Sequence, residues 1–129
     1  MAERHLDYQT IHDSVIQTAY NNLDKVKHDV YINPGNIKNT QVSGLYPDII
    51  ITKKDEKNVK FIIEVETQDS INQNEVQQWT EYSNIGGQFY LLVPKNMKDT
   101  AELLCRQNNI KARIGTYYKD NSQIIIKYD

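Results

Sequence analysis

The chain of 129 residues has little cysteine, no long apolar run and no excess of basic residues. Its single cysteine, Cys105, excludes an intramolecular disulfide and any pair of thiols at metal-ligand spacing. No apolar run approaches the roughly 18 residues that a membrane-spanning helix requires. The N-terminal sequence MAERHLDYQT has no apolar core of a secretory signal, so we expect no membrane segment and a cytoplasmic location.

The charge balance is slightly acidic, because 15 Lys and Arg face 17 Asp and Glu, for a formal net charge of −2. Proteins that bind nucleic acid tightly through its phosphates are usually basic, so this balance argues against strong non-specific binding. Local basic patches are still allowed, and Lys53, Lys54, Lys57 and Lys60 gather in one segment. The simplest interpretation of these four lysines is a solvated turn. The length suits one domain with one core.

Apolar periodicity predicts an α/β protein with the element order α-β-β-β-α-β-α-β-β. Helices are expected over 7–25, 70–84 and 97–108, and strands over 28–32, 49–51, 59–65, 88–93, 112–118 and 123–128. Residues 37–42 are polar and are predicted to form a loop or a short continuation of a strand. Thr10 with Asp13, and Ser70 with Gln73, have the spacing of capping boxes at helix N-termini, although Asp7 could cap the first helix one turn earlier. A helix between two buried strands predicts a right-handed crossover to a parallel neighbour.

The segment 44–67 predicts a β-hairpin whose two strands both end in acidic residues on the side away from the turn. Asp48 precedes the first strand, and Glu64 and Glu66 close the second. Because side chains alternate along a strand, Glu64 and Glu66 share one face, and antiparallel pairing would bring Asp48 close to them. Carboxylates so close repel one another unless a positive charge lies among them. A divalent cation held by oxygen ligands is the simplest candidate.

Three short motifs follow one another along the chain: Pro47-Asp48, Glu64-Val65-Glu66, and Gln78 with Tyr82 in QWTEY. In this order and spacing they resemble the PD-(D/E)XK nuclease superfamily, and the last matches the QxxxY motif of its RecB-like members. The resemblance covers about residues 44–94. It implies a restriction-endonuclease-like fold with an αβββαβ core, a mixed sheet flanked by helices, and here an extra C-terminal helix and strands in a single domain, 1–129.

The resemblance also implies a metal-dependent nuclease that hydrolyses phosphodiester bonds in DNA with Mg²⁺ or Mn²⁺. Asp48 and Glu64 would be metal ligands, with the backbone carbonyl of Val65 as a third. Gln78 and Tyr82 would contact the substrate or brace the site from their helix. As a purely structural alternative, these two residues form an i, i+4 pair that closes on the core. Trp79, between them, is expected to be core packing.

Glu66 departs from the pattern, because the superfamily usually has lysine at this position. A carboxylate there would bind a second metal or orient the attacking water, and its charge favours more metal rather than less. Lys60 lies on the same strand face as Glu64, but roughly 13 Å away along the strand, which is too far to replace the missing lysine. In the superfamily the first helix often gives an acidic residue to the site, and Asp13 with Gln17 could do so here. The simpler interpretation of Asp13 and Gln17 is that they are surface polar positions of an amphipathic helix.

The three histidines, His5, His12 and His28, have no shared metal spacing and are expected to be surface residues. The single cysteine excludes the iron–sulfur cluster that some nucleases of this fold carry. Glu66 stands where the superfamily usually has lysine, and the pI of about 5.9 is acidic. Both support an alternative, a catalytically inactive nuclease-like module that binds a protein or nucleic acid. A third interpretation is an unrelated α/β domain with a chance motif match. An exposed C-terminal strand, 123–128, could pair with a second subunit, so a homodimer or a partner protein is allowed.

Overall fold

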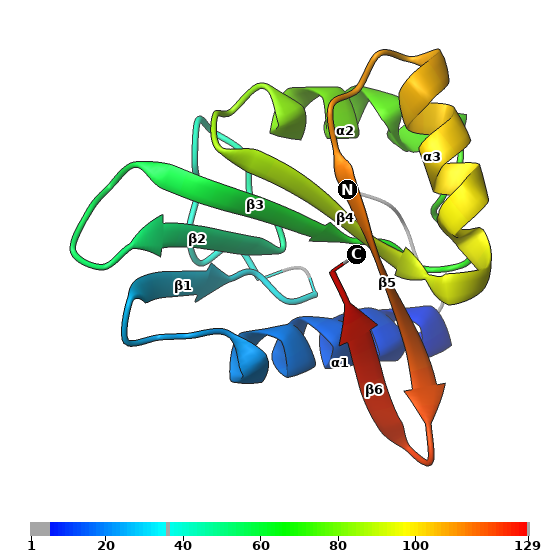
Figure 1. Ribbon diagram of the computed structural model, residues 1–129, viewed down its shortest axis with the longest axis horizontal. Coiled ribbons are helices and arrows are strands. Elements are labelled where there is room, and N and C mark those ends of the chain that lie inside the picture. Colours follow the sequence, from blue (N-terminus) through cyan, green and yellow to red (C-terminus); the bar gives the residue numbers. More distant parts are fainter. Residues whose placement is uncertain (1–5, 36, 129) are drawn as a thin grey trace.

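The computed structural model describes residues 6–35 and 37–128. One six-stranded mixed sheet curls through the molecule, with α1 on one face and α2 and α3 on the other (Figure 1). The helices are α1 (Leu6–Asn22), α2 (Val76–Ser83) and α3 (Lys98–Gln107), with short 3₁₀ turns η1 (Gln73–Glu75) and η2 (Lys95–Met97). The strands are β1 (His28–Ile32), β2 (Ile49–Lys53), β3 (Val59–Val65), β4 (Gln88–Pro94), β5 (Arg113–Asp120) and β6 (Gln123–Lys127). The predicted α/β class is confirmed.

The strands lie in the sheet in their chain order, β1-β2-β3-β4-β5-β6. β1, β2 and β3 form an antiparallel meander, β3, β4 and β5 run parallel, and β6 returns antiparallel to β5. Parallel neighbours need a crossover, and α2 and α3 supply the two that this sheet requires. The parallel pair predicted around the second helix is therefore confirmed.

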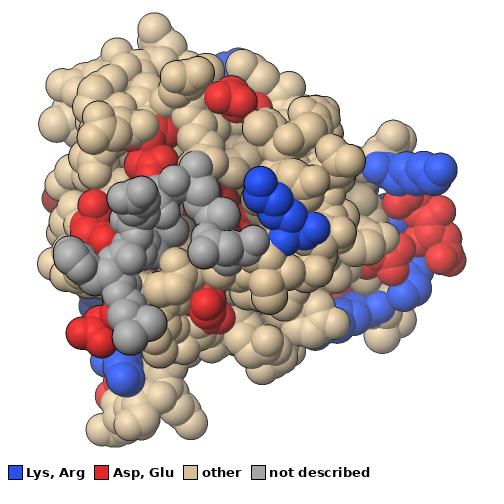
Figure 2. Space-filling view, turned by 180° about the vertical axis from the view of Figure 1, so that it is seen from behind, with Lys and Arg blue, Asp and Glu red and all other residues tan. Residues whose placement is uncertain are grey.

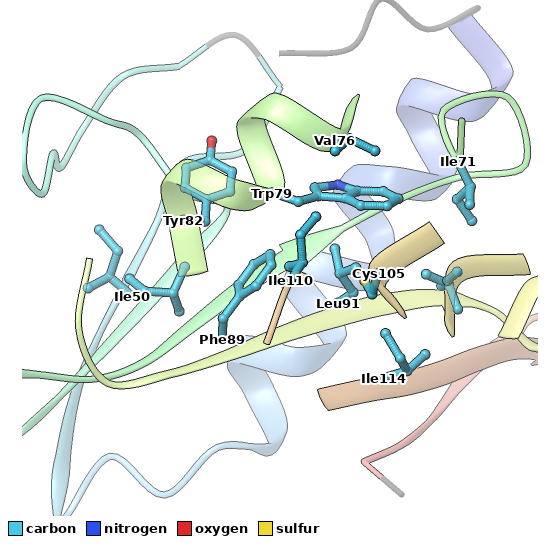
Figure 3. Close-up of a cluster of buried hydrophobic side chains, with 13 residues drawn as sticks. Ile50, Ile71, Val76, Trp79, Tyr82, Phe89, Leu91, Cys105, Ile110 and Ile114 are labelled. Atoms are coloured by element: carbon cyan, nitrogen blue, oxygen red, sulfur yellow. The ribbon is translucent and has the colours of Figure 1, made fainter. Parts of the chain in front are cut away.

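The two faces of the sheet bury separate apolar clusters. Under α2 and α3, Trp79 is fully buried and lies with Tyr82 above Phe89 of β4 (Figure 3). On the opposite face, Val15 and Ile16 of α1 pack on alternate residues of the central strands. Trp79 is thus a core residue, as predicted. In the part of the chain that the structure describes, no helix is long and apolar enough to cross a lipid bilayer.

Both predicted capping boxes are wrong. α1 begins at Leu6, so Thr10 and Asp13 lie inside the helix, which also ends earlier than predicted, at Asn22. The hydroxyl of Ser70 donates to Glu66 Oε1 at 2.7 Å instead of capping a helix. The second helix begins later, at Val76, after the turn η1, whose cap is the side chain of Asn72. Residues 37–42 form no named strand, only an isolated bridge between Val42 and Leu45.

Candidate functional site

Pairing of β2 with β3 brings the first two predicted carboxylates together. Ile49 lies opposite Ile63, so Asp48 and Glu64 flank the end of the ladder. The backbone N–H of Asp48 donates to Glu64 Oε1 at 3.1 Å. Both side chains are buried, with 2% and 3% of their surface exposed. The hairpin prediction is therefore confirmed, and it places two acidic groups side by side away from bulk water.

Asp48 is held from two directions. Its Oδ2 accepts the backbone N–H of Val65 at 2.8 Å and lies 2.9 Å from Nε2 of His12 on α1. The prediction that His12 is a surface residue is wrong, because only 1% of it is exposed. His12 stands three and four residues before the buried Val15 and Ile16, so helical spacing alone places it on the apolar face of α1. That periodicity was the signal that could have identified it.

Asp13 contacts the other nitrogen of the same imidazole. Its Oδ1 lies 3.0 Å from His12 Nδ1 and accepts Gln9 Nε2 at 2.9 Å and the backbone N–H of Gly35 at 2.8 Å. Asp13 therefore orients His12 and ties the β1–β2 loop to α1. Gln17 does not join it, because its side chain donates to Asn21 on the exposed side of the helix. Of the other histidines, His28 is half-buried on β1 and His5 lies outside the described residues.

A buried asparagine fixes the loop that precedes Asp48. Asn33 Nδ2 donates to the carbonyl oxygens of Thr40 and Pro47 at 2.8 and 2.7 Å. Its Oδ1 accepts the N–H groups of Asn39 and Thr40, both at 2.9 Å. Since the amide of Asn33 is satisfied on both sides, the loop enters β2 at one defined position. The Pro-Asp motif is held there, which sequence reasoning did not anticipate.

Glu66 lies just beyond β3, and its N–H extends the ladder by donating to the carbonyl of Leu92 at 2.9 Å. Its carboxylate accepts Ser70 Oγ at Oε1 and Trp79 Nε1 at Oε2, at 2.7 and 2.9 Å. Its carbonyl accepts the hydroxyl of Tyr117 at 2.7 Å. In this arrangement Glu66 joins the strand end to α2 and β5. The metal-binding or water-orienting role expected from the resemblance stays a prediction.

Gln78 and Tyr82 lie on one face of α2, as their spacing predicts. Gln78 Nε2 donates to the hydroxyl of Tyr82 at 3.1 Å. The ring of Tyr82 also belongs to the apolar cluster, 6.0 Å from the ring of Phe89. Burial and then the negative charge of Glu64 raise the pKa of the Tyr82 phenol. Tyr82 therefore stays protonated, and its hydroxyl lies in the field of the carboxylates.

The surroundings of Glu64 disfavour a negative charge on its carboxyl group. Burial raises the pKa of its carboxyl well above the ordinary value, and the negative charges of Asp48 and then Glu66 raise it further. No lysine or arginine forms an ion pair with Glu64 within the described residues. Removing a charge from water without a compensating cation costs free energy, so this site favours either a proton or a metal ion.

The donor set suits a hard cation in part. Mg²⁺ is commonly held by one or two carboxylates, with water and substrate phosphate completing its shell. Asp48 and Glu64 supply two carboxylates, and burial, followed by the negative charges of Asp48 and Glu66, raises the pKa of Glu64. Over residues 6–35 and 37–128, no group of three His, Cys, Asp or Glu side chains is arranged to hold a metal ion. The fit therefore depends on Asp48, Glu64 and a backbone carbonyl such as that of Val65.

Comparison of the chain with protein-family models, with curated proteins and with solved structures finds no match in any of the three.

Proposed function

We propose that the protein is a metal-dependent nuclease of the PD-(D/E)XK class that hydrolyses phosphodiester bonds in DNA. The observation that carries the proposal is the buried pair of Asp48 and Glu64, which the strand pairing holds together without a lysine or arginine partner among the described residues. The element order α1-β1-β2-β3-α2-β4 and the change from antiparallel to parallel pairing at β3 support the restriction-endonuclease-like core. The antiparallel pair that joins Asp48 to Glu64 argues against a chance match.

In this proposal, Mg²⁺ or Mn²⁺ would be held by Asp48, Glu64 and the carbonyl of Val65, and would polarise the scissile phosphodiester and activate water. The protein's own groups keep these ligands in place. His12 and the Val65 N–H hold one oxygen of Asp48, and the Asp48 N–H holds one oxygen of Glu64. Such outer contacts orient metal ligands and commonly change activity 10–100-fold when removed.

The test is cleavage of labelled single-stranded, duplex, flap and branched DNAs with Mg²⁺ or Mn²⁺. Asp48→Asn and Glu64→Gln keep the shape of each side chain and remove its charge, so each should reduce cleavage at least about 100-fold. Asp55→Asn and Glu56→Gln are matched controls, because both carboxylates are exposed at the turn of the same hairpin. Cleavage that survives both site substitutions would show that these carboxylates are not the catalytic pair.

A non-catalytic module that binds a protein or nucleic acid is the second candidate. It is favoured by Glu66, which replaces the usual lysine and whose two carboxylate oxygens both accept protein donors. This candidate predicts no cleavage by the unmodified protein on any of the four substrates with either metal. Retained binding of an oligonucleotide or a protein would then support it.

A further inference from the structure

A groove with a volume of about 350 Å³ opens beside the carboxyl ends of β3 and β4. Residues of α1, β5 and β6 complete its walls. Its lining includes Tyr8, Thr67, Pro94, Lys95, Tyr118 and Lys119. In sheets with parallel strands, ligands commonly bind outside the carboxyl ends of those strands. The groove therefore lies where this fold would receive a ligand.

The groove adjoins the carboxylate site. Thr67, in its wall, directly follows Glu66, and Ile11 directly precedes His12. Tyr117, another wall residue, donates its hydroxyl to the carbonyl of Glu66 at 2.7 Å. A chain of nucleotides lying in the groove would thus pass next to the strand end that carries the acidic residues.

The charged side chains that line the groove among the described residues are all basic. Lys95 and Lys119 are the charged side chains among the described residues that line it, and both are exposed. No carboxylate of the described residues lies within ion-pair distance of either ammonium group. In a protein with a net charge of −2, two lysines in one groove, without a carboxylate partner among the described residues, favour an anionic ligand.

The lining also offers an aromatic face. Lys95 Nζ lies 5.0 Å from the centroid of the Tyr118 ring, so an ammonium group and a phenol ring are presented together. Gln68 and Asn96, also in the wall, are joined through their side-chain amides. Aromatic rings stack on the faces of unpaired bases, while lysines attract the phosphates that link them. Ring and cation together therefore suit a nucleotide better than an acidic peptide.

We propose that this groove binds a single-stranded segment of nucleic acid, with Lys95 and Lys119 contacting phosphates and a base lying against Tyr118. A base exposes its face only when it is unpaired, so stacking on Tyr118 requires a single strand. On the face seen in Figure 2, lysine and arginine side chains are scattered rather than joined in a stripe that would follow a duplex. The choice of DNA over RNA rests on the proposed nuclease function.

The test is fluorescence anisotropy of a labelled single strand of about 12 nucleotides and of its duplex, with the unmodified protein in EDTA so that no cleavage occurs. The double substitution Lys95→Gln with Lys119→Gln should weaken single-strand binding about tenfold and reduce the slope of log K against log salt by about 1.4. Tyr118→Leu should weaken binding about tenfold with an unchanged slope.

Two matched controls accompany these variants. Lys57→Gln with Lys60→Gln removes two exposed lysines at the opposite end of the sheet, and Tyr31→Leu removes an exposed tyrosine of β1. Both should bind as the unmodified protein does. An equal loss in a control, equal binding of the duplex, or equal competition by polyglutamate would overturn the proposal, as would no single-strand binding by the unmodified protein.

The nuclease function and single-strand binding in the groove can be contradicted independently of each other. Cleavage that depends on Asp48, with single-strand binding unaffected by the groove variants, would support the nuclease proposal and contradict the proposal that the groove binds a single strand. Binding that depends on Lys95 and Lys119, without any cleavage, would support the groove and contradict the nuclease. All variants should keep the thermal unfolding curve of the parent, and the lysine pair, being exposed, keeps the test decisive if Tyr118→Leu fails to fold.

Discussion

Acidic residues lie at both ends of the β2–β3 hairpin, but in opposite environments. At the turn, Lys54 Nζ lies 3.0 Å from Asp29 Oδ1 and Lys53 Nζ lies 3.7 Å from Glu56 Oε2, all in contact with solvent. Acidic and basic side chains mix at this end (Figure 2), and the predicted solvated turn is confirmed. At the other end, Asp48 and Glu64 are buried and have no lysine or arginine as an ion-pair partner among the described residues.

The pKa values follow this difference. The backbone N–H of Asp55 and then Lys54 lower the pKa of Asp29, whereas burial and then the charge of Asp48 raise that of Glu64. Two carboxyl groups of similar intrinsic acidity, Asp29 on β1 beside the hairpin turn and Glu64 at the buried end of the hairpin, therefore have pKa values shifted in opposite directions. Burial without a lysine or arginine partner among the described residues, rather than residue type, marks the end of the hairpin where chemistry is expected.

The largest effect should come from Glu66→Ala, which removes the acceptor of the buried Trp79 N–H and leaves a cavity between β3 and α2. We expect a loss of about 3–4 kcal/mol in the free energy of unfolding, measured by urea denaturation. Glu66→Gln keeps one amide oxygen as an acceptor and should lose roughly half as much. A loss in Glu66→Ala no larger than that of exposed Glu81→Ala would show that Glu66 does not brace the strand end.

His12→Ala should cause the second-largest loss in the free energy of unfolding. The substitution removes a buried ring and the partner of Asp48 Oδ2, so we expect a loss of about 2–3 kcal/mol in the same measurement. The matched control is His28→Ala, because His28 is only half-buried on the edge strand β1. Equal losses in the two variants would contradict the link between α1 and Asp48.

Glu64→Gln should act in the opposite direction and stabilise the protein at high pH. Folding raises the pKa of Glu64 above its ordinary value of 4.5. Between the unfolded-state pKa and the higher folded-state pKa, the native state binds more protons than the unfolded state, so the free energy of unfolding falls as pH rises. The variant does not titrate at this position. The free energy of unfolding of the variant should therefore equal that of the parent near about pH 4 and be larger by roughly 1–2 kcal/mol near pH 8. Gains of this size are common when a substitution relieves an unfavourable site.

Thermal unfolding across the pH range tests this sign. Glu56→Gln, at the exposed turn, should show no such growing difference between acid and alkaline conditions. If Glu64→Gln destabilised the protein at pH 8, a favourable cation partner for Glu64 would have to exist, and the contrast between the two ends of the hairpin would fail.

The smallest effect is expected for Lys54→Gln at the turn. Its pair with Asp29 is exposed, so water and salt screen it and the thermal midpoint should hardly move. Any small shift should vanish at about 1 M salt, where screening extends only about 3 Å. A shift comparable to that of His12→Ala would mean that the turn is as important to stability as the buried end.

Local patterns predicted the hairpin, the shared face of Glu64 and Glu66, and the pair of Gln78 with Tyr82. Each depends on residues close in sequence, where the period of a strand or helix fixes the direction of the side chain. The cap assigned to Ser70 failed because its hydroxyl found a buried carboxylate four residues earlier. A local cap and a tertiary partner compete for the same group, and the buried partner is costlier to leave unsatisfied.

Local sequence patterns were enough to predict the elements, their order and the acidic residues at one end of the hairpin, because alternation and helical spacing act over a few residues. The partners of those acidic residues depend on how the helices pack on the sheet. His12 reaches Asp48 across 36 positions because α1 packs on the sheet, and Trp79 reaches Glu66 because α2 packs on the opposite face. Burial by those helices keeps water from Glu64, and so sets the charge balance of the site.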